Sequence, residues 1–203
     1  MHLHKAMIKT NDTVIREALV SRLNAEYATN PEYRIIPELG LWHGAARIDV
    51  AVVNGVLHGF EIKSDRDTLA RLPEQREAYN SVFDKVSLVV GSKHFVAAFK
   101  IVPEWWGIET VRVSEGGSLL FNQIREPKYN TEQDDISIAR LLRRNEALDL
   151  LDRAGKADGV RSKSRDMIYE KIVESIELET LKTYVRTVLQ GSRQDWRFGA
   201  QLA

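Results

Sequence analysis

The chain has no cysteine among its 203 residues, which excludes disulfide bonds and thiolate-bound zinc. It has no apolar run near the roughly 18 residues that cross a bilayer. The amino-terminal stretch MHLHKAMIKT also lacks the basic start and apolar core of a signal peptide. We therefore expect a cytoplasmic protein that has no membrane partner.

Net charge is absent as well, because 29 basic residues balance 29 acidic ones. A protein that coats nucleic acid through its overall field is normally basic, so only a local patch could serve that purpose here. The apolar content of 43% and the charged content of 29% are those of an ordinary globular protein. The length suits one domain with appendages or two small domains.

The amino-terminal half shows a helix and then strands. Apolar residues at helical spacing after Asn11 predict a helix over residues 13–27. Residues 33–39 read as a strand that Pro37 interrupts, which favours an edge strand or a bulge. Two β-rich runs, 47–53 and 56–63, flank Asn54-Gly55 and predict a hairpin.

The register of this hairpin decides which charged side chains meet. A two-residue turn would put Asp49 and Glu61 on opposite faces, whereas a three-residue loop with a left-handed Gly55 puts them on one face. We predict the three-residue loop. One face then carries Ile48, Val50, Val52, His58, Phe60 and Ile62. The other face carries Asp49, Ala51, Gly59, Glu61 and Lys63.

The remaining pattern predicts a helix over 69–82, an internal strand over 85–91, a helix or short strand over 95–102 and a hairpin over 111–121. A polar stretch at 126–133 suggests a boundary, so we expect an α/β core over 1–125 and a helical region over 126–203. Helices are expected at 136–154, 165–176 and 179–189. The best basic patch of this region consists of Arg140, Arg143, Arg144, Arg161, Lys163 and Arg165. It suits either a contact with nucleic acid or a plain solvated appendage.

Asp49, Glu61 and Lys63 carry the sharpest chemical signal. Two carboxylates on one sheet face repel each other unless a cation joins them, and magnesium prefers such oxygen ligands. A lysine two residues further on could activate water or stabilise a phosphate transition state. The alternative interpretation is a solvated strand face with alternating charge.

The order of an aspartate, a hairpin, Glu61-Ile62-Lys63 and then a helix with Gln75 and Tyr79 resembles the PD-(D/E)xK, or restriction-endonuclease-like, nuclease superfamily. It is similar to the RecB-like branch and to a group of short bacterial and phage proteins. Ile48 stands where the motif name has proline. The resemblance implies a mixed central sheet that is flanked by helices.

The resemblance also implies roles for individual residues. Asp49, Glu61 and the main-chain carbonyl of Ile62 would bind Mg²⁺ or Mn²⁺, with Glu38 as accessory acid in preference to Glu17. Lys63 would act in catalysis. Gln75 and Tyr79 would support the metal site or contact a phosphate.

The sequence therefore predicts a metal-dependent nuclease, a hydrolase of phosphodiester bonds that acts on DNA rather than RNA, as a possible homodimer. Two alternatives stay open. One is an inactive nuclease fold that binds nucleic acid or a partner protein. The other is a hydrolase of small phosphate compounds.

Overall fold

The computed structural model describes residues 10–191, so the stretch 1–9 and the last residues of the predicted helical region lie outside the described part. A six-stranded sheet in the order β1-β2-β3-β4-β5-β6 forms its centre. The strands are β1 (Arg34–Leu41), β2 (Ala46–Val53), β3 (Leu57–Lys63), β4 (Lys85–Gly91), β5 (Gly107–Val113) and β6 (Leu119–Arg125).

The sheet is mixed, which confirms the predicted α/β class. Strands β3, β4 and β5 run parallel, while β1 to β3 and the pair β5 and β6 are antiparallel. The helices of the described part are α1 (Asp12–Glu26), α2 (Leu72–Asn80), α3 (Phe95–Ile101), α4 (Asp135–Ala139), α5 (Arg144–Arg153), α6 (Arg165–Ser175) and α7 (Leu178–Gln190). A short 3₁₀ turn, η1 (Trp42–Gly44), joins β1 to β2.

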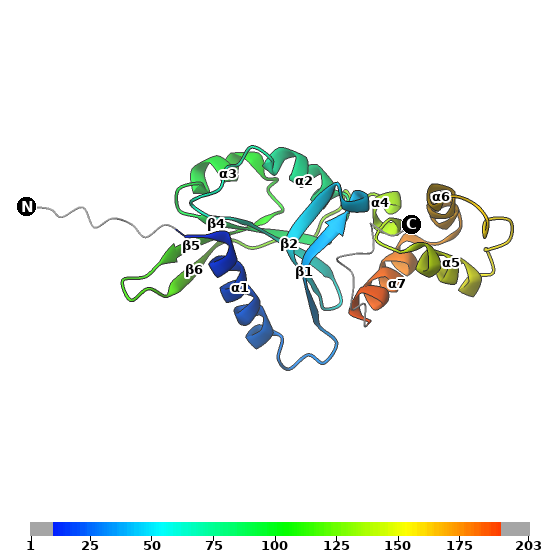
Figure 1. Ribbon diagram of the computed structural model, residues 1–203, viewed down its shortest axis with the longest axis horizontal. Helices are drawn as coiled ribbons and strands as arrows, with labels where there is room; N and C mark the ends of the chain where they lie inside the picture. The colour runs from blue at the N-terminus through cyan, green and yellow to red at the C-terminus, as the bar shows by residue number, and fades with distance from the viewer. Residues whose placement is uncertain (1–9, 192–203) are drawn as a thin grey trace, which may run out of the picture.

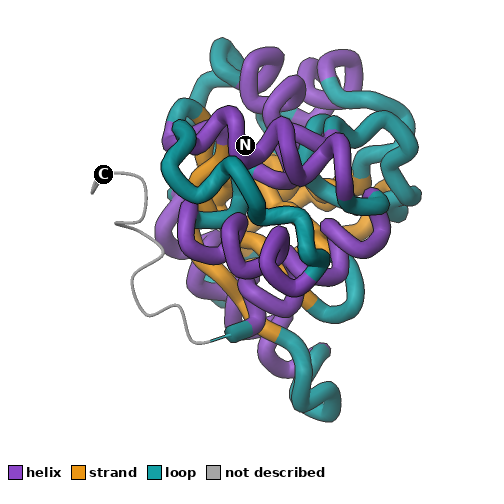
Figure 2. Tube along the Cα trace, turned by 90° about the vertical axis from the view of Figure 1, so that its right-hand side faces the viewer, coloured by secondary structure: helices purple, strands orange, loops and turns teal. Residues whose placement is uncertain are grey.

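The helices form three groups around the sheet. In Figure 1, α2 and α3 lie over one face of the sheet, and α1 lies on the other side. Helices α4 to α7 gather beyond β1 and β2, and Figure 2 shows helices in front of the strands when this side faces the viewer. The carboxy-terminal helices therefore stand next to the β1–β2 corner, where the predicted site lies.

Helix α1 forms where the sequence predicts it. The Asn11 side chain accepts a hydrogen bond from the Val14 amide and caps the first turn. Ile15, Leu19 and Leu23 recur every four residues and are buried against the sheet face formed by Val50, Val52, Phe60 and Ile62. This face is one of two apolar clusters that sandwich the sheet.

The hairpin between β2 and β3 has the predicted odd loop. Val53 pairs with Leu57 across the three residues 54–56, and Gly55 has a φ of +93°. Ala51 lies opposite Gly59, so the alternation of faces is the predicted one along the paired part of the two strands. The predicted alternation fails before Val50, because Ile48 packs in the cluster on the other face from Val50. Asp49 contacts Arg16 of α1, whereas Glu61 contacts Gln75 and Tyr79 of α2.

The single helix predicted over 136–154 is wrong, because the chain forms α4 and α5 with a break between them. Arg143 is extended (φ −70°, ψ 160°), and its amide donates to the Glu146 carboxylate, which starts a new helix. Periodicity alone missed this stop, because apolar residues continue at helical spacing through it. Arg140 and Arg143, at the two ends of the break, both line the cleft described below.

The α/β part and the helices share one apolar cluster, which runs from Ile36 on β1 to Leu189 on α7. Buried Asp84 adds a polar link, since it accepts from the Leu57 amide and pairs with Lys182 of α7 at 2.7 Å. The sequence break near residue 126 is thus a change of secondary structure within a continuous core. Between residues 10 and 191, no helix is long and apolar enough to cross a membrane.

Candidate functional site: a charged cleft

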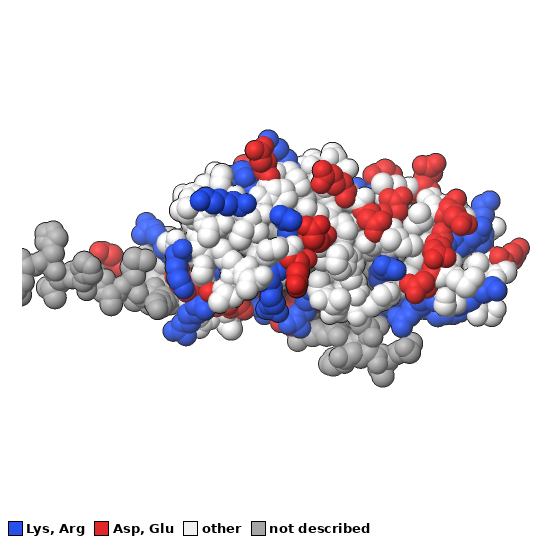
Figure 3. Space-filling view, turned by 90° about the horizontal axis from the view of Figure 1, so that it is seen from above, with Lys and Arg blue, Asp and Glu red and all other residues white. Residues whose placement is uncertain are grey.

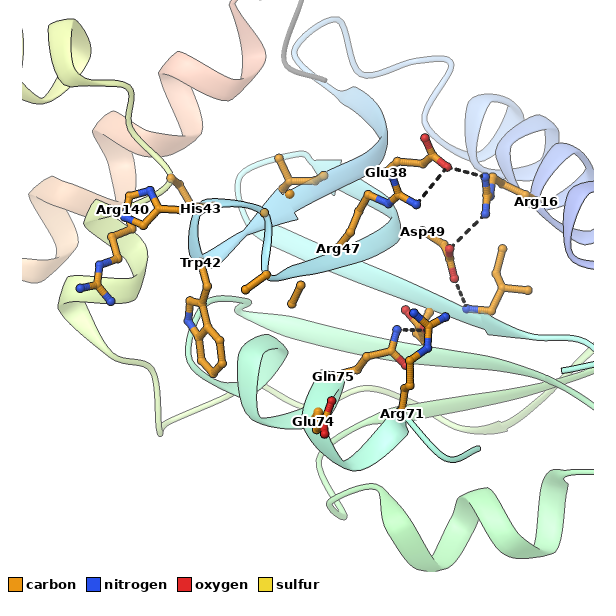
Figure 4. Close-up of a pocket in the computed structure, with 18 of the residues that line it drawn as sticks. Arg16, Glu38, Trp42, His43, Arg47, Asp49, Arg71, Glu74, Gln75 and Arg140 are labelled. Carbon is orange, nitrogen blue, oxygen red and sulfur yellow. Dashed lines mark hydrogen bonds and ion pairs between the residues drawn. The ribbon is translucent and has the colours of Figure 1, made fainter. Parts of the chain in front are cut away.

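A cleft of about 1150 Å³ lies between the β1–β2 corner of the sheet and the carboxy-terminal helices. Side chains from α1, β1, β2, β3 and α2 line what we call the sheet end. His43, Arg140, Arg143, Arg165 and Tyr169 line what we call the arginine end. Figure 4 shows Arg16, Glu38 and Asp49 at the first end, and His43 and Arg140 at the second.

Asp49 sits where β2 and β3 separate. Their backbone pairing runs from Val53 only as far as Val50, and beyond it the Asp49 carboxylate accepts a hydrogen bond from the Ile62 amide at 2.8 Å. Its other oxygen pairs with Arg16 of α1 at 3.1 Å (Figure 4). Burial, and then the nearby Glu61 carboxylate, raise the pKa of Asp49 from 3.8 to about 7 against these two favourable contacts.

Glu61 is almost fully buried, and the protein itself satisfies both of its oxygens. One oxygen accepts from Lys63 at 2.5 Å and from Gln75 at 2.8 Å. The other lies 2.6 Å from the Tyr79 hydroxyl. Burial and the Glu61 charge raise the pKa of Tyr79, so its hydroxyl stays protonated. Together these contacts neutralise the Glu61 charge within the core.

Glu38 owes its position to an irregular backbone. Its φ of +56° breaks the pairing of β1 with β2 after Pro37, where the sequence predicts a bulge or an edge. The side chain then reaches Arg16 at 3.2 Å. Arg16 also pairs with Asp12 at 2.7 Å, so a single guanidinium holds three carboxylates from α1, β1 and β2 together.

The turn η1 is strained beside the cleft. Trp42 and His43 have positive φ values of 48° and 57°, and Gly44 follows at 94°. Each non-glycine residue in this conformation costs roughly 1–2 kcal/mol, so the surroundings must hold it there. The Trp42 indole N–H does so by donating to Ser137 of α4 at 3.1 Å and to Ser81 after α2 at 3.2 Å. The turn presents His43 to the arginine end.

The arginine end arises from the break between α4 and α5 and from the start of α6. Arg140 ends α4, Arg143 caps α5 and Arg165 opens α6. Both Arg140 and Arg165 interact electrostatically with Tyr169, whose ring lies 6.0 Å from that of His43. Arg140 pairs with Asp166 at 3.4 Å, yet its buried Nε has no hydrogen-bond partner in the described part of the chain.

The structure brings most of the predicted site residues together. Asp49, Glu61, Ile62, Lys63, Glu38 and Gln75 all line the cleft, and Tyr79 lies behind Glu61. Arg165 also lines it. Arg161 does not, because it pairs with Asp152, and Lys163 lies in the α5–α6 loop, where its carbonyl accepts from Arg144. Glu17 is exposed on α1 and does not line the cleft.

Sequence reasoning missed Arg16 and His43. Asp12 and Arg16 are one turn apart on α1, which marks a charged face, but nothing in the sequence shows that this face meets Asp49. His43 carries no signal in the sequence, because no other histidine stands at a spacing suitable for a metal site. Its strained conformation is visible only in three dimensions.

The residues as arranged do not fit a metal ion. Both Glu61 oxygens already accept hydrogen bonds, from Lys63, Gln75 and Tyr79. The Asp49 oxygens accept from Arg16 and from the Ile62 amide. Within residues 10–191, no group of three or more histidine, aspartate or glutamate side chains could hold a metal ion. The expectation of Mg²⁺ or Mn²⁺ therefore finds no support in this arrangement and stays a prediction.

Fold and cleft define an α/β protein with a charged cleft between a mixed sheet and a helical carboxy-terminal part. The chain belongs to the Bacteriophage P4 protein cII family, whose model matches residues 6–197. It is 29% identical over 156 residues to Protein cII of Enterobacteria phage P4, a match that covers 77% of this chain and 58% of that protein. The chain thus spans less than two thirds of this relative's length. No solved structure matches it.

The family overturns the predicted function. The chain belongs with phage protein cII, so the prediction of a metal-dependent nuclease, and with it the hydrolase class, is wrong. The geometry explains why the sequence pattern led to a wrong prediction. Asp49, Glu61 and Lys63 do gather in one place, but Glu61 and Lys63 neutralise each other, and Asp49 faces Arg16. The residues that suggested a reactive centre form a network in which each negative charge faces a positive one.

Proposed function

We propose that the protein binds nucleic acid at the arginine end of the cleft and does not cleave it. The observation that carries this proposal is the convergence of Arg140, Arg143 and Arg165 from three helices on one cavity. Among the described residues that line the cleft, α4, α5 and α6 contribute no aspartate or glutamate. Positive charge is therefore concentrated there.

The chemistry of these groups suits phosphate. A guanidinium offers a planar fork of donors that matches phosphate oxygens and stays charged at any physiological pH. Arg140 has a buried Nε that lacks a partner in the described region, and buried donors usually find an acceptor. An anion between the helices and η1 would supply one.

The charge of the whole molecule favours a local contact over a general attraction. Net charge is zero, and in Figure 3 acidic and basic side chains both occur across the visible face without either sign covering it. The cleft volume exceeds the upper end of ordinary small-molecule sites, roughly 1000 Å³, and leaves room for part of a strand. DNA is our first candidate and RNA the second.

Fluorescence anisotropy with labelled DNA and RNA oligonucleotides tests the proposal, in buffer that contains EDTA. We expect saturable binding, and a separate incubation with Mg²⁺ in place of EDTA should leave the oligonucleotides intact. Arg140→Ala and Arg165→Ala should each weaken binding by about fivefold to tenfold and lower the salt dependence by about one phosphate contact. The matched control is Arg112→Ala, since Arg112 is exposed on β5 and does not line the cleft. Equal affinity for all four proteins, or no binding by the wild type, would refute the proposal.

The other expectations stay predictions. These are a cytoplasmic location, a homodimer, the division into a core over 1–125 and a helical region over 126–203, and kinship of the sheet with a restriction-endonuclease-like core. Gel filtration with light scattering would test the homodimer, and limited proteolysis near residue 126 would test the division into domains.

A further inference from the structure

The two ends of the cleft differ in charge, and the difference limits how a strand can lie in it. At the sheet end, acidic side chains outnumber basic ones by six to four. The acidic ones are Asp12, Glu38, Asp49, Glu61, Asp67 and Glu74, and the basic ones are Arg16, Arg47, Lys63 and Arg71. Three arginines and a histidine, with no acid, line the arginine end.

A strand that ran through the whole cleft would bring phosphates against these carboxylates. Like charges only a few ångströms apart repel each other strongly at the effective dielectric constant of a partly buried site. Of the four basic side chains of the sheet end, Arg16, Lys63 and Arg47 already pair with Asp49, Glu61 and Glu38, which leaves only Arg71 against the remaining carboxylates. Phosphates are thus favoured at one end of the cleft and opposed at the other.

A nucleobase, unlike a phosphate, is favoured at the sheet end, because it is uncharged and carries amino and imino donors. The sheet end offers acceptors for such donors. Gln75 is the clearest, since its Oε1 is buried and has no hydrogen-bond partner among residues 10–191, while its amide nitrogen is fixed by Glu61. Figure 4 shows Gln75 and Glu74 on α2, on the same side of the cleft.

We infer that the cleft takes the phosphorylated end of a strand, with the end phosphate at Arg140, Arg143 and Arg165 and the terminal base toward Gln75. This inference rests on the proposed function. An end phosphate carries a charge of about −1.5 to −2 at neutral pH, against −1 for an internal phosphodiester, so three guanidinium groups discriminate in its favour.

The test compares four single strands of one sequence, again in EDTA and with the full chain: 5′-phosphorylated, 3′-phosphorylated, unphosphorylated and circular. We expect one phosphorylated end to bind about tenfold more tightly than the unphosphorylated strand. The circle should bind no better than the unphosphorylated strand. Arg165→Ala should abolish the preference, whereas Arg112→Ala should keep it.

The outcomes separate this inference from the proposed function. If the circle binds as well as a phosphorylated end, or if the preference survives in both Arg140→Ala and Arg165→Ala, the inference is wrong and nucleic-acid binding stands. If no strand binds, both are wrong. Thermal melting of each variant, monitored by circular dichroism, must show a folded protein before its affinity is compared.

Discussion

At the sheet end of the cleft, the charged side chains of the core compensate one another, whereas the arginine end keeps a surplus of one sign. Glu61 and Lys63 form a pair with side-chain exposures of 1% and 7%, and Asp49 faces Arg16. Arg140, by contrast, is about one third exposed and has a single weak ion pair. Removal of one partner of a charge pair inside a core is costly, whereas arginines that line a cavity can contact a ligand.

The largest effect should follow from breaking the buried pair. Glu61→Ala leaves Lys63 in the core without its carboxylate, and removal of one partner of such a pair costs about 3–5 kcal/mol. Urea denaturation should show this loss in the free energy of unfolding. The double variant Glu61→Leu/Lys63→Met should recover much of it, because no uncompensated charge remains. A double variant as unstable as the single one would show that the network matters through geometry and not through charge.

The second effect concerns pH at the same end of the cleft. The pKa of Asp49 is raised from 3.8 to about 7, so the folded state holds a proton that the unfolded chain has released. The stability tied to this carboxyl is present below pH 3.8 and is lost as the pH rises toward 7. Between pH 5 and pH 8 the loss is about 2–3 kcal/mol.

Asp49→Asn removes this titration and keeps an acceptor for the Ile62 amide. Urea denaturation at pH 5 and pH 8 should therefore show that the variant gains stability relative to the wild type as the pH rises. A constant difference between the two proteins would show that Asp49 is ionised throughout, with Arg16 outweighing burial.

Local sequence features predicted much of the fold, and they also predicted most of the residues that meet in the cleft. The Asn11 cap, the apolar spacing of α1 and the parity of the β2–β3 hairpin each depend on neighbours in the chain, so they could be read from the sequence. The break after Arg140 was missed, because apolar spacing continues through it and arginine is not one of the residues that usually cap a helix, although Glu146 supplies a local cap three residues after Arg143.

The function was mispredicted for a related reason. A sequence can indicate that Asp49, Glu61 and Lys63 lie close together, but it does not show which other side chains contact them. Arg16 comes from a helix more than 30 residues earlier and Gln75 from a helix after the hairpin, and their contacts turn candidate ligands into satisfied partners. The compensation of charge that separates the two ends of the cleft is a property of tertiary structure.

The smallest effect on stability should come from Trp42, which connects the two ends of the cleft. Trp42→Phe removes the indole N–H that bridges to Ser137 and Ser81, a loss of about 1 kcal/mol in the free energy of unfolding. Trp105→Phe is the matched control, because the Trp105 Nε1 is buried without a partner in the described part and should cost no hydrogen bond. Since Trp42 fixes the strained turn that carries His43, its replacement should also weaken binding at the arginine end. If both tryptophan variants lose the same stability and neither loses affinity, the turn only packs against the helices and does not orient the site.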